Sequence, residues 1–147
     1  MKKIAIITFL SLAVALSAFS SPIGNNITQK ASNILTKKFT GATQISWSNT
    51  DTYLKATFKL NGNVMFAYFD ASGEFTGLAR NMVSLELPLN LQMELKTNYS
   101  SGWITELFEF AGPENTQYFA TIETSDDKLL LVSSGTTSWS VYKKTKK

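Results

Sequence analysis

Residues 52–70 read TYLKATFKLNGNVMFAYFD, two alternating segments around a short turn. Apolar and polar side chains alternate over 52–60 and again over 63–70, a period of two that is typical of β-strands. Asn61 and Gly62 between them favour a type I′ turn, because both central positions of that turn need a positive φ. The stretch therefore predicts an antiparallel β-hairpin.

The two-residue turn also predicts which side chains share a face of the hairpin. It pairs Leu60 with Asn63, and a slip of one residue would exchange the two faces. The face expected to form the core carries Leu54, Ala56, Phe58, Met65, Ala67 and Phe69. The opposite face mixes aromatic and polar groups and carries Tyr53, Lys55, Thr57, Lys59, Val64, Phe66, Tyr68 and Asp70.

Helices are predicted on either side of this strand region. Apolar residues over 27–39 recur with a 3.6-residue period, which is typical of a helix lying on an apolar surface. A tight turn over 70–74 leads into a strand over 75–82, and Pro88 opens a second helix over 88–99. Four further strands are predicted over 103–110, 116–124, 128–133 and 137–143.

The order of helix and strands occurs twice, which suggests an internal duplication. Residues 52–58 and 116–122 match as T-x-x-x-A-T-apolar at an offset of 64. Two similar hairpins could also match in this way by chance. Applying the same offset to the two faces of the first hairpin predicts the faces of the second. Its core face should carry Tyr118, Ala120, Ile122, Leu129 and Leu131, and its other face should carry Phe119, Thr121, Glu123, Leu130 and Val132. We interpret the chain as an α+β fold with helices packed on one face of an antiparallel β-sheet, in tandem repeats 27–84 and 85–143.

The N-terminus is predicted to be a signal peptide over residues 1–20. Lys2 and Lys3 precede an apolar stretch of 13 residues over 4–16, and Ala18 and Ser20 are small residues suited to a cleavage site near Ser20. An uncleaved anchor is the alternative, although spanning a membrane takes roughly 20 apolar residues. We therefore expect a periplasmic or secreted domain over 21–147 with no membrane span.

Composition argues against several classes of function. The 147 residues suit one domain and include no Cys and no His, so disulfides, thiolate metal sites and histidine acid–base chemistry are excluded. There is no G-x-S-x-G motif, and we expect no catalysis, cofactor or metal. Four of the 14 basic residues lie in a C-terminal tail over 143–147, and Arg80 is the single arginine, which argues against nucleic acid. The tail is expected to be a solvated end, with contact to anionic lipid or polysaccharide as the alternative.

A pattern of aromatics and turns extends over most of residues 27–143. Its parts are Lys38-Phe39 at a helix end, Ala42 with Ile45-x-Trp47, the segment Tyr53 to Phe58, the turn Ala67-Tyr68-Phe69-Asp70-x-x-Gly73, and Leu87-Pro88 opening a helix. This pattern resembles the PepSY-like family of secreted Bacteroidota proteins, which is similar to the β-lactamase-inhibitor proteins. The resemblance implies an α+β fold in which helices cover one sheet face and leave the other open. Ser48 departs from the family, which usually has an acidic residue after the Trp.

The open face is the candidate binding site. A sheet covered on one side usually has a polar second face, whereas aromatic side chains are expected here, and aromatics are common binding anchors. The predicted site comprises Trp47, Tyr53, Lys55, Phe66, Tyr68 and Phe119, with Trp139 as a further aromatic of the open face. The expected partner is a protein or peptide of the envelope, for example an enzyme or protease that is inhibited. The alternatives are a carbohydrate or cell-surface polymer, and a structural protein whose aromatics simply pack together.

Overall fold

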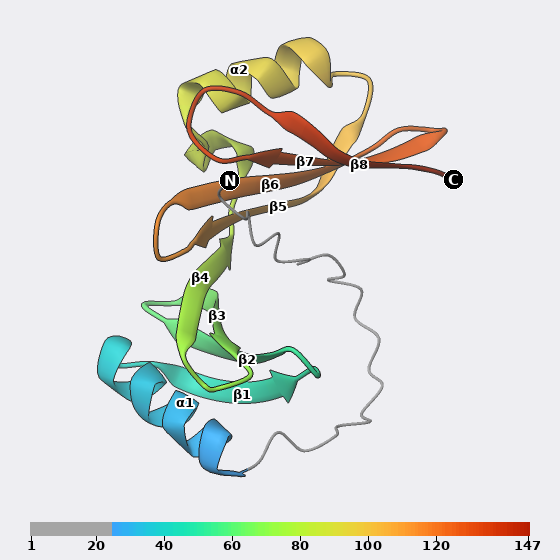
Figure 1. Cartoon of the computed structure of the whole chain (residues 1–147). Coiled ribbons are helices and arrows are strands. Elements are labelled where there is room, and N and C mark those ends of the chain that lie inside the picture. The colour runs from blue at the N-terminus through green and yellow to red at the C-terminus, as the bar shows by residue number, and fades with distance from the viewer. Residues whose placement is uncertain (1–24) are drawn as a thin grey trace.

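The structure, a computed structural model, describes residues 25–147 and contains one eight-stranded antiparallel sheet and two α-helices (Figure 1). The predicted signal peptide lies outside the described residues. The elements in chain order are α1 (Asn25–Lys38), β1 (Thr43–Asn49), β2 (Tyr53–Leu60), β3 (Asn63–Asp70), β4 (Phe75–Asn81), the 3-10 turn η1 (Ser84–Glu86), α2 (Leu89–Asn98), β5 (Trp103–Ala111), β6 (Thr116–Glu123), β7 (Asp127–Ser133) and β8 (Ser140–Lys146). Each strand pairs with the next one in the sequence, so the sheet order is β1 to β8.

The predicted hairpin is confirmed in its turn and in its register. Asn61 and Gly62 have φ values of 50° and 82°, and strand β2 pairs with β3 from Leu60 opposite Asn63 to Tyr53 opposite Asp70. The face predicted to form the core is the one that α1 covers. Turn chemistry and side-chain alternation were therefore sufficient to assign the two faces here.

Two separate hydrophobic cores lie under the two helices. In the first, Ala31 and Leu35 of α1 are fully buried over β2 and β3, and Phe39 contacts Phe58 with ring centroids 5.2 Å apart. In the second, Leu91 and Leu95 of α2 are buried over β5, β6 and β7. Each helix contributes one apolar stripe and stabilises one half of the sheet.

Trp139 was predicted on the open face, and this prediction is wrong. Its side chain is buried in the core under α2, where the indole N–H donates a hydrogen bond to the Leu91 carbonyl oxygen at 3.0 Å. The Trp139 backbone N–H donates to the Glu94 carboxylate at 2.9 Å. These contacts hold the chain off the sheet at this residue, so β8 begins at Ser140 instead of the predicted residue 137.

Three of the four C-terminal lysines lie in β8 and Lys147 follows it, so this segment is not a free tail. Lys144 pairs with Asp127 at 2.8 Å, and Lys147 pairs with Glu123 at 2.9 Å. The main chain of Lys147 also donates a hydrogen bond to the Asp126 carbonyl oxygen at 2.9 Å. The strand is nevertheless an exposed edge along its whole length.

Strand β1 forms the other edge of the sheet and was not predicted from the sequence. Its residues TQISWSN are mostly exposed and polar, so they give a weak alternation signal. A bulge between Thr43 and Ser46 interrupts its pairing with β2. Trp47 then lies directly opposite Ala56.

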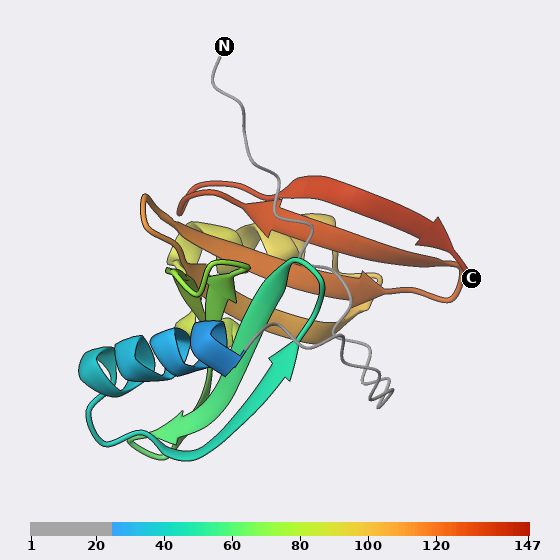
Figure 2. The same cartoon turned by 60° about the horizontal axis from the view of Figure 1, so that its bottom comes forward.

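The sheet bends sharply in its middle, and this bend positions the candidate site. The helices lie at opposite ends of the molecule in Figure 1, with all the strands between them, and Figure 2 shows the second half of the sheet behind the first. Strand β4 joins the halves, and it pairs with β5 only from Leu78 opposite Ala111 to Asn81 opposite Phe108. Because both helices pack on the same face, the bend turns the uncovered faces of the two halves toward each other.

Candidate functional site

The face opposite the helices carries a connected cluster of aromatic side chains, which we call the aromatic face. It comprises Tyr53, Phe66, Tyr68, Phe108, Phe110 and Phe119, on β2, β3, β5 and β6. Alternation places these residues on one side of the sheet, because Tyr68 lies opposite Lys55 and Phe119 lies opposite Phe108. Ala79 of β4 lies at the bend and belongs to the same cluster, between the aromatic residues of the two halves.

Five of the six predicted site residues lie on this face. Tyr53 and Tyr68 are in contact, with ring centroids 5.9 Å apart, and the Lys55 ammonium lies 5.8 Å from the centre of the Phe66 ring. Phe119 comes from the other half of the chain and joins the same cluster. The predicted open-face residues are thus brought together across strands that are distant in sequence.

Trp47 is the exception, and its predicted place on the open face is wrong. Because it lies opposite Ala56, it shares the helix-covered face, and its ring contacts Phe69 with centroids 5.5 Å apart. It is a half-buried part of the core under α1.

Phe108 and Phe110 belong to the aromatic face but were not predicted as site residues. Phe108 stacks on Phe119, with centroids 4.8 Å apart and the ring planes at 11°. Phe110 makes an edge contact with Tyr68 at 6.0 Å. The alternation in Glu106-Leu-Phe-Glu-Phe110 indicates a strand with both Phe residues on one side, and this signal could have identified them.

The aromatic face is not evenly exposed. Tyr68 and Phe110 are buried, with 9% and 8% of their surface accessible, whereas Tyr53, Phe66 and Phe119 are half-buried. The Phe110 ring lies against the backbone of Gly77, where a Cβ atom would come within 2.2 Å of the ring. The expectation that Tyr68 is an exposed side chain is therefore wrong. Burial raises the pKa of its phenol to about 12, and the nearby Tyr53 adds to the effect.

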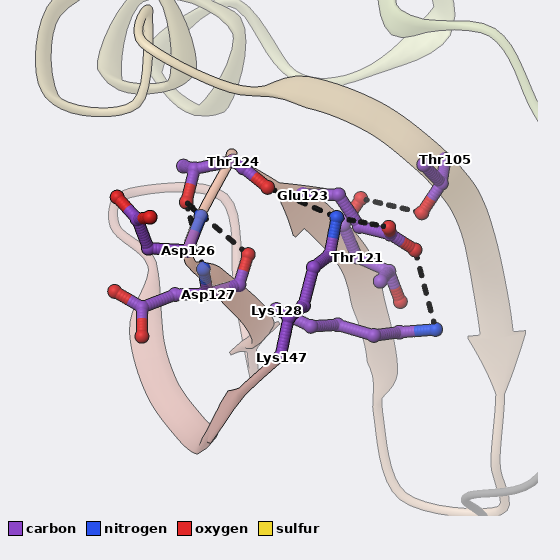
Figure 3. A network of polar contacts seen from close by, with 8 residues as sticks. All are labelled: Thr105, Thr121, Glu123, Thr124, Asp126, Asp127, Lys128 and Lys147. Atoms are coloured by element: carbon purple, nitrogen blue, oxygen red, sulfur yellow. Dashed lines mark hydrogen bonds and ion pairs between the residues drawn. The ribbon is translucent and has the colours of Figure 1, made fainter.

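A network of polar contacts surrounds the turn between β6 and β7 (Figure 3). The Lys147 ammonium donates hydrogen bonds to the Glu123 carboxylate at 2.9 Å and to the Thr124 carbonyl oxygen at 3.0 Å, and Lys128 lies 3.5 Å from Glu123. The hydrogen bond from Lys147 is the main reason that the pKa of Glu123 is lowered. The network fixes the C-terminus to the end of the sheet.

Glu106 of β5 makes a further polar contact with β6. The buried Thr121 hydroxyl donates a hydrogen bond to the Glu106 carboxylate at 2.9 Å, and its carbonyl oxygen accepts one from Thr105. Trp103 lies opposite Glu123 and is 67% exposed. A large exposed aromatic side chain thus stands beside the charged end of the face.

Other charged residues have structural partners. Arg80 makes ion pairs with Glu86 at 3.0 Å and Glu109 at 2.9 Å, which join β4, η1 and β5. The hydrogen bond to Glu86 is the main reason that the pKa of the guanidinium is raised, and Glu109 adds to the effect. Within residues 25–147, no group of three or more Asp or Glu residues is placed to hold a metal ion. No helix of this same part of the chain is both long and apolar enough to cross a membrane.

Comparisons with known proteins identify the fold. No protein-family model and no curated protein sequence matches this chain. Among solved structures, a DUF2874 family protein from Bacteroides uniformis is similar with a TM-score of 0.70 and 16% identity over 80% of this chain and 87% of that one. A BLIP-like protein from Bacteroides fragilis gives a TM-score of 0.66 and 20% identity over 80% of this chain and 84% of that one.

A third similar structure, from Bacteroides eggerthii, is provisionally named a periplasmic protein. It has a TM-score of 0.69 and 17% identity over 80% of this chain and 86% of that one. At these identities the likeness concerns the fold alone, and it supports the predicted α+β, β-lactamase-inhibitor-like architecture.

Proposed function

We propose that this chain is a non-catalytic binding module of the periplasm or cell exterior that docks a protein or peptide onto its aromatic face. The observation that carries the proposal is the aromatic cluster itself, which lies on the sheet face that neither helix covers. The two halves of this face turn toward each other at the bend and bury Tyr68 and Phe110, whereas Tyr53, Phe66 and Phe119 stay partly accessible. Aromatic side chains there are suited to a partner, since they bury large area at little cost in conformational entropy.

The burial pattern assigns different roles to the members of the face. The half-buried Tyr53, Phe66 and Phe119, with Lys55 beside Phe66, would contact the partner. Tyr68 and Phe110 are buried and would hold their neighbours in place instead of forming the contact surface. Such pre-organisation lowers the entropic cost of binding.

The proposed location rests on the N-terminal signal pattern and on the name of one similar structure. The basic residues Lys2 and Lys3, the apolar stretch and the small residues near Ser20 favour export. The similar structure named as periplasmic is consistent with that location. We likewise propose membership of the PepSY-like family, on the sequence pattern described above.

The proposed duplication is supported by the strand registers. The β6–β7 pairs repeat the β2–β3 pairs at an offset of 64, for example Ala120 with Leu131 and Ala56 with Ala67. The buried pair Ala31 and Leu35 in α1 recurs as Leu91 and Leu95 in α2, at an offset of 60. The offset changes from 60 to 64 within the β5–β6 hairpin, because the pair of Trp47 with Ala56 recurs there as Leu107 with Ala120.

Photo-crosslinking in the native envelope tests the docking site. A photoreactive amino acid placed at Phe66 or at Phe119 should capture the same protein, whereas one placed at Asn33 on the outer side of α1 should not. The Phe66→Ala and Phe119→Ala variants should each weaken binding of that protein by about 1–2 kcal/mol. The Val141→Ala variant removes an exposed apolar side chain from β8 and is the matched control.

The outcomes separate the candidate functions. Crosslinking to one protein from both positions, with weaker binding by the two Phe variants, supports docking of a protein. Binding on a glycan array that is lost in the same variants would assign the face to carbohydrate. Equal binding by the two Phe variants and the Val141 control would refute a role of the aromatic face.

A further inference from the structure

Strand β8 forms an open edge of the sheet, along the outer border of its second half (Figure 2). It pairs with β7 alone, and all seven of its residues are exposed. The Lys147 main-chain N–H donates a hydrogen bond to the Asp126 carbonyl oxygen on the β7 side at 2.9 Å. Because main-chain groups alternate in direction along an antiparallel strand, those of Lys144 and Lys146 point away from β7. They form a row of hydrogen-bonding groups to which another strand can pair.

Both ends of β8 are held in place by side-chain contacts. Directly before the strand, the Trp139 indole donates to the Leu91 carbonyl oxygen and the Trp139 backbone N–H donates to the Glu94 carboxylate. Directly after it, the Lys147 ammonium pairs with the Glu123 carboxylate. A strand anchored in this way keeps its extended shape, which lowers the entropic cost of adding a further strand beside it.

The edge also carries positive charges that this chain does not neutralise. Lys144 pairs with Asp127 at 2.8 Å, whereas Lys143 and Lys146 make no ion pair with any residue over 25–147. Pairing with β7 is regular over this segment, with Lys143 opposite Leu130 and Lys146 opposite Asp127. Residues three apart on a strand point to opposite faces of the sheet. One unpaired ammonium therefore flanks the edge on each face.

We propose that β8 binds an extended acidic segment of another protein as an additional strand of the sheet. Main-chain hydrogen bonds to Lys144 and Lys146 supply affinity, and two carboxylates three residues apart supply specificity by pairing with Lys143 and Lys146. This spacing fits a segment in either direction, because the two carboxylates then still lie on opposite faces. Lysines on an edge also repel a second copy of the same edge, so the charge selects an acidic strand over self-pairing.

The opposite edge of the sheet lacks these features. Strand β1 has no charged residue, its pairing with β2 is interrupted between Thr43 and Ser46, and Gln44 has a positive φ of 54°. An irregular, uncharged edge is a poor template for a further strand. Strand β7 separates β8 from Phe119 of the aromatic face, so binding at the β8 edge does not rest on the proposed docking function and can be tested separately.

Two peptides of the same composition test the charge spacing by fluorescence anisotropy with the exported chain. The peptide TVETTEVT, blocked at both ends, has its two Glu residues three apart and should bind. The peptide TVETETVT has them two apart, on one face of an extended strand, and should bind several-fold more weakly. Equal binding of the two peptides would overturn the pairing assigned to Lys143 and Lys146.

N-methylation of the peptide separates strand pairing from attraction between charges. An added strand uses only every second amide to pair with β8. Of two forms of TVETTEVT that are methylated on alternate sets of amides, one should therefore lose binding at least about ten-fold and the other should retain it. If both forms bind as the unmodified peptide does, the peptide does not form a strand and the proposal is wrong.

Variants of the chain test the same contacts from its side. Lys143→Glu/Lys146→Glu should weaken binding of TVETTEVT at least about ten-fold. Lys37→Glu/Lys96→Glu makes the same change of charge on the exposed sides of α1 and α2 and should bind as the wild type does. Lys144→Pro removes an outward N–H, which an edge strand tolerates, and should weaken binding several-fold more than Lys144→Ala. Circular dichroism melts verify that each variant is folded.

Two further results would overturn the proposal as a whole. One is the absence of binding by the wild type at about 1 mM TVETTEVT. The other is binding of dextran sulfate that is lost in the Lys143→Glu/Lys146→Glu variant and is equal in Lys144→Pro and Lys144→Ala, without binding of the peptide. That result would assign the lysines of β8 to an anionic polysaccharide.

Discussion

Replacing Gly77 by Ala tests whether Phe110 is seated on the backbone of β4. The added Cβ atom would meet three carbon atoms of the Phe110 ring, at 2.2, 2.7 and 3.0 Å. Carbon atoms in contact lie about 3.5–4.0 Å apart, so the ring must move by about 1 Å or more. Phe110 is buried and contacts Tyr68, and such a movement disturbs the centre of the aromatic face.

The size of the effect follows from two opposing contributions. Forcing extra volume into a packed site costs about 1–3 kcal/mol. Replacing Gly by Ala also restricts the unfolded chain, which stabilises the fold by about 0.4–1 kcal/mol. We expect Gly77→Ala to lower the free energy of unfolding by about 1–2 kcal/mol and the Tm by about 4–8 °C.

A double-mutant cycle isolates the contact. In the Phe110→Ala background the ring is absent, so adding Gly77→Ala should cost nothing or stabilise the fold, with a coupling energy of about 1–3 kcal/mol. Gly135→Ala is the matched control, because no atom beyond its chain neighbours lies within 4 Å of the position that a Cβ would take there, and it should change stability by less than about 0.5 kcal/mol. Urea titration of the four variants and the wild type measures these values. If Gly77→Ala costs the same with and without the Phe110 ring, the assigned packing is incorrect.

Further predictions concern the two faces and two titrating groups. Phe58→Ala, in the core under α1, should cost about 3–5 kcal/mol in urea titration, and the half-buried Phe66→Ala should cost clearly less; the reverse order would invert the face assignment. Lys147→Ala should raise the pKa of Glu123 toward its ordinary value, because its main stabilising hydrogen bond is removed, and an unchanged carboxyl titration in NMR would contradict the network. The phenol of Tyr68 should ionise near pH 12 in ultraviolet titration. Because this pKa is raised in the folded state, its contribution to stability is complete below the unfolded value near pH 10 and is lost as the pH rises toward 12, a dependence that Tyr68→Phe should remove.

The sequence by itself determined the local structure of this protein. Asn61 and Gly62 specify the turn, and the turn specifies the pairing of β2 with β3, because the side-chain alternation of a strand leaves one register that buries the apolar set. The 3.6-residue stripe around Ala31 and Leu35 likewise predicted the face of α1 that is buried. These features depend on contacts between residues that are close in sequence, so they can be predicted from the sequence alone.

The tertiary structure alone decided that Trp47 and Trp139 are not part of the site and that Tyr68 is buried within it. Trp47 lies on the covered face because the bulge in β1 sets its register against Ala56, and Trp139 is buried because Leu91, 48 residues earlier, lies over it. Tyr68 is buried together with Phe110, whose ring reaches it from the other half of the sheet across Gly77. Alternation predicts the face of the strand on which a side chain lies. How deeply that side chain is buried depends on distant strands, which contact it only because the sheet is bent.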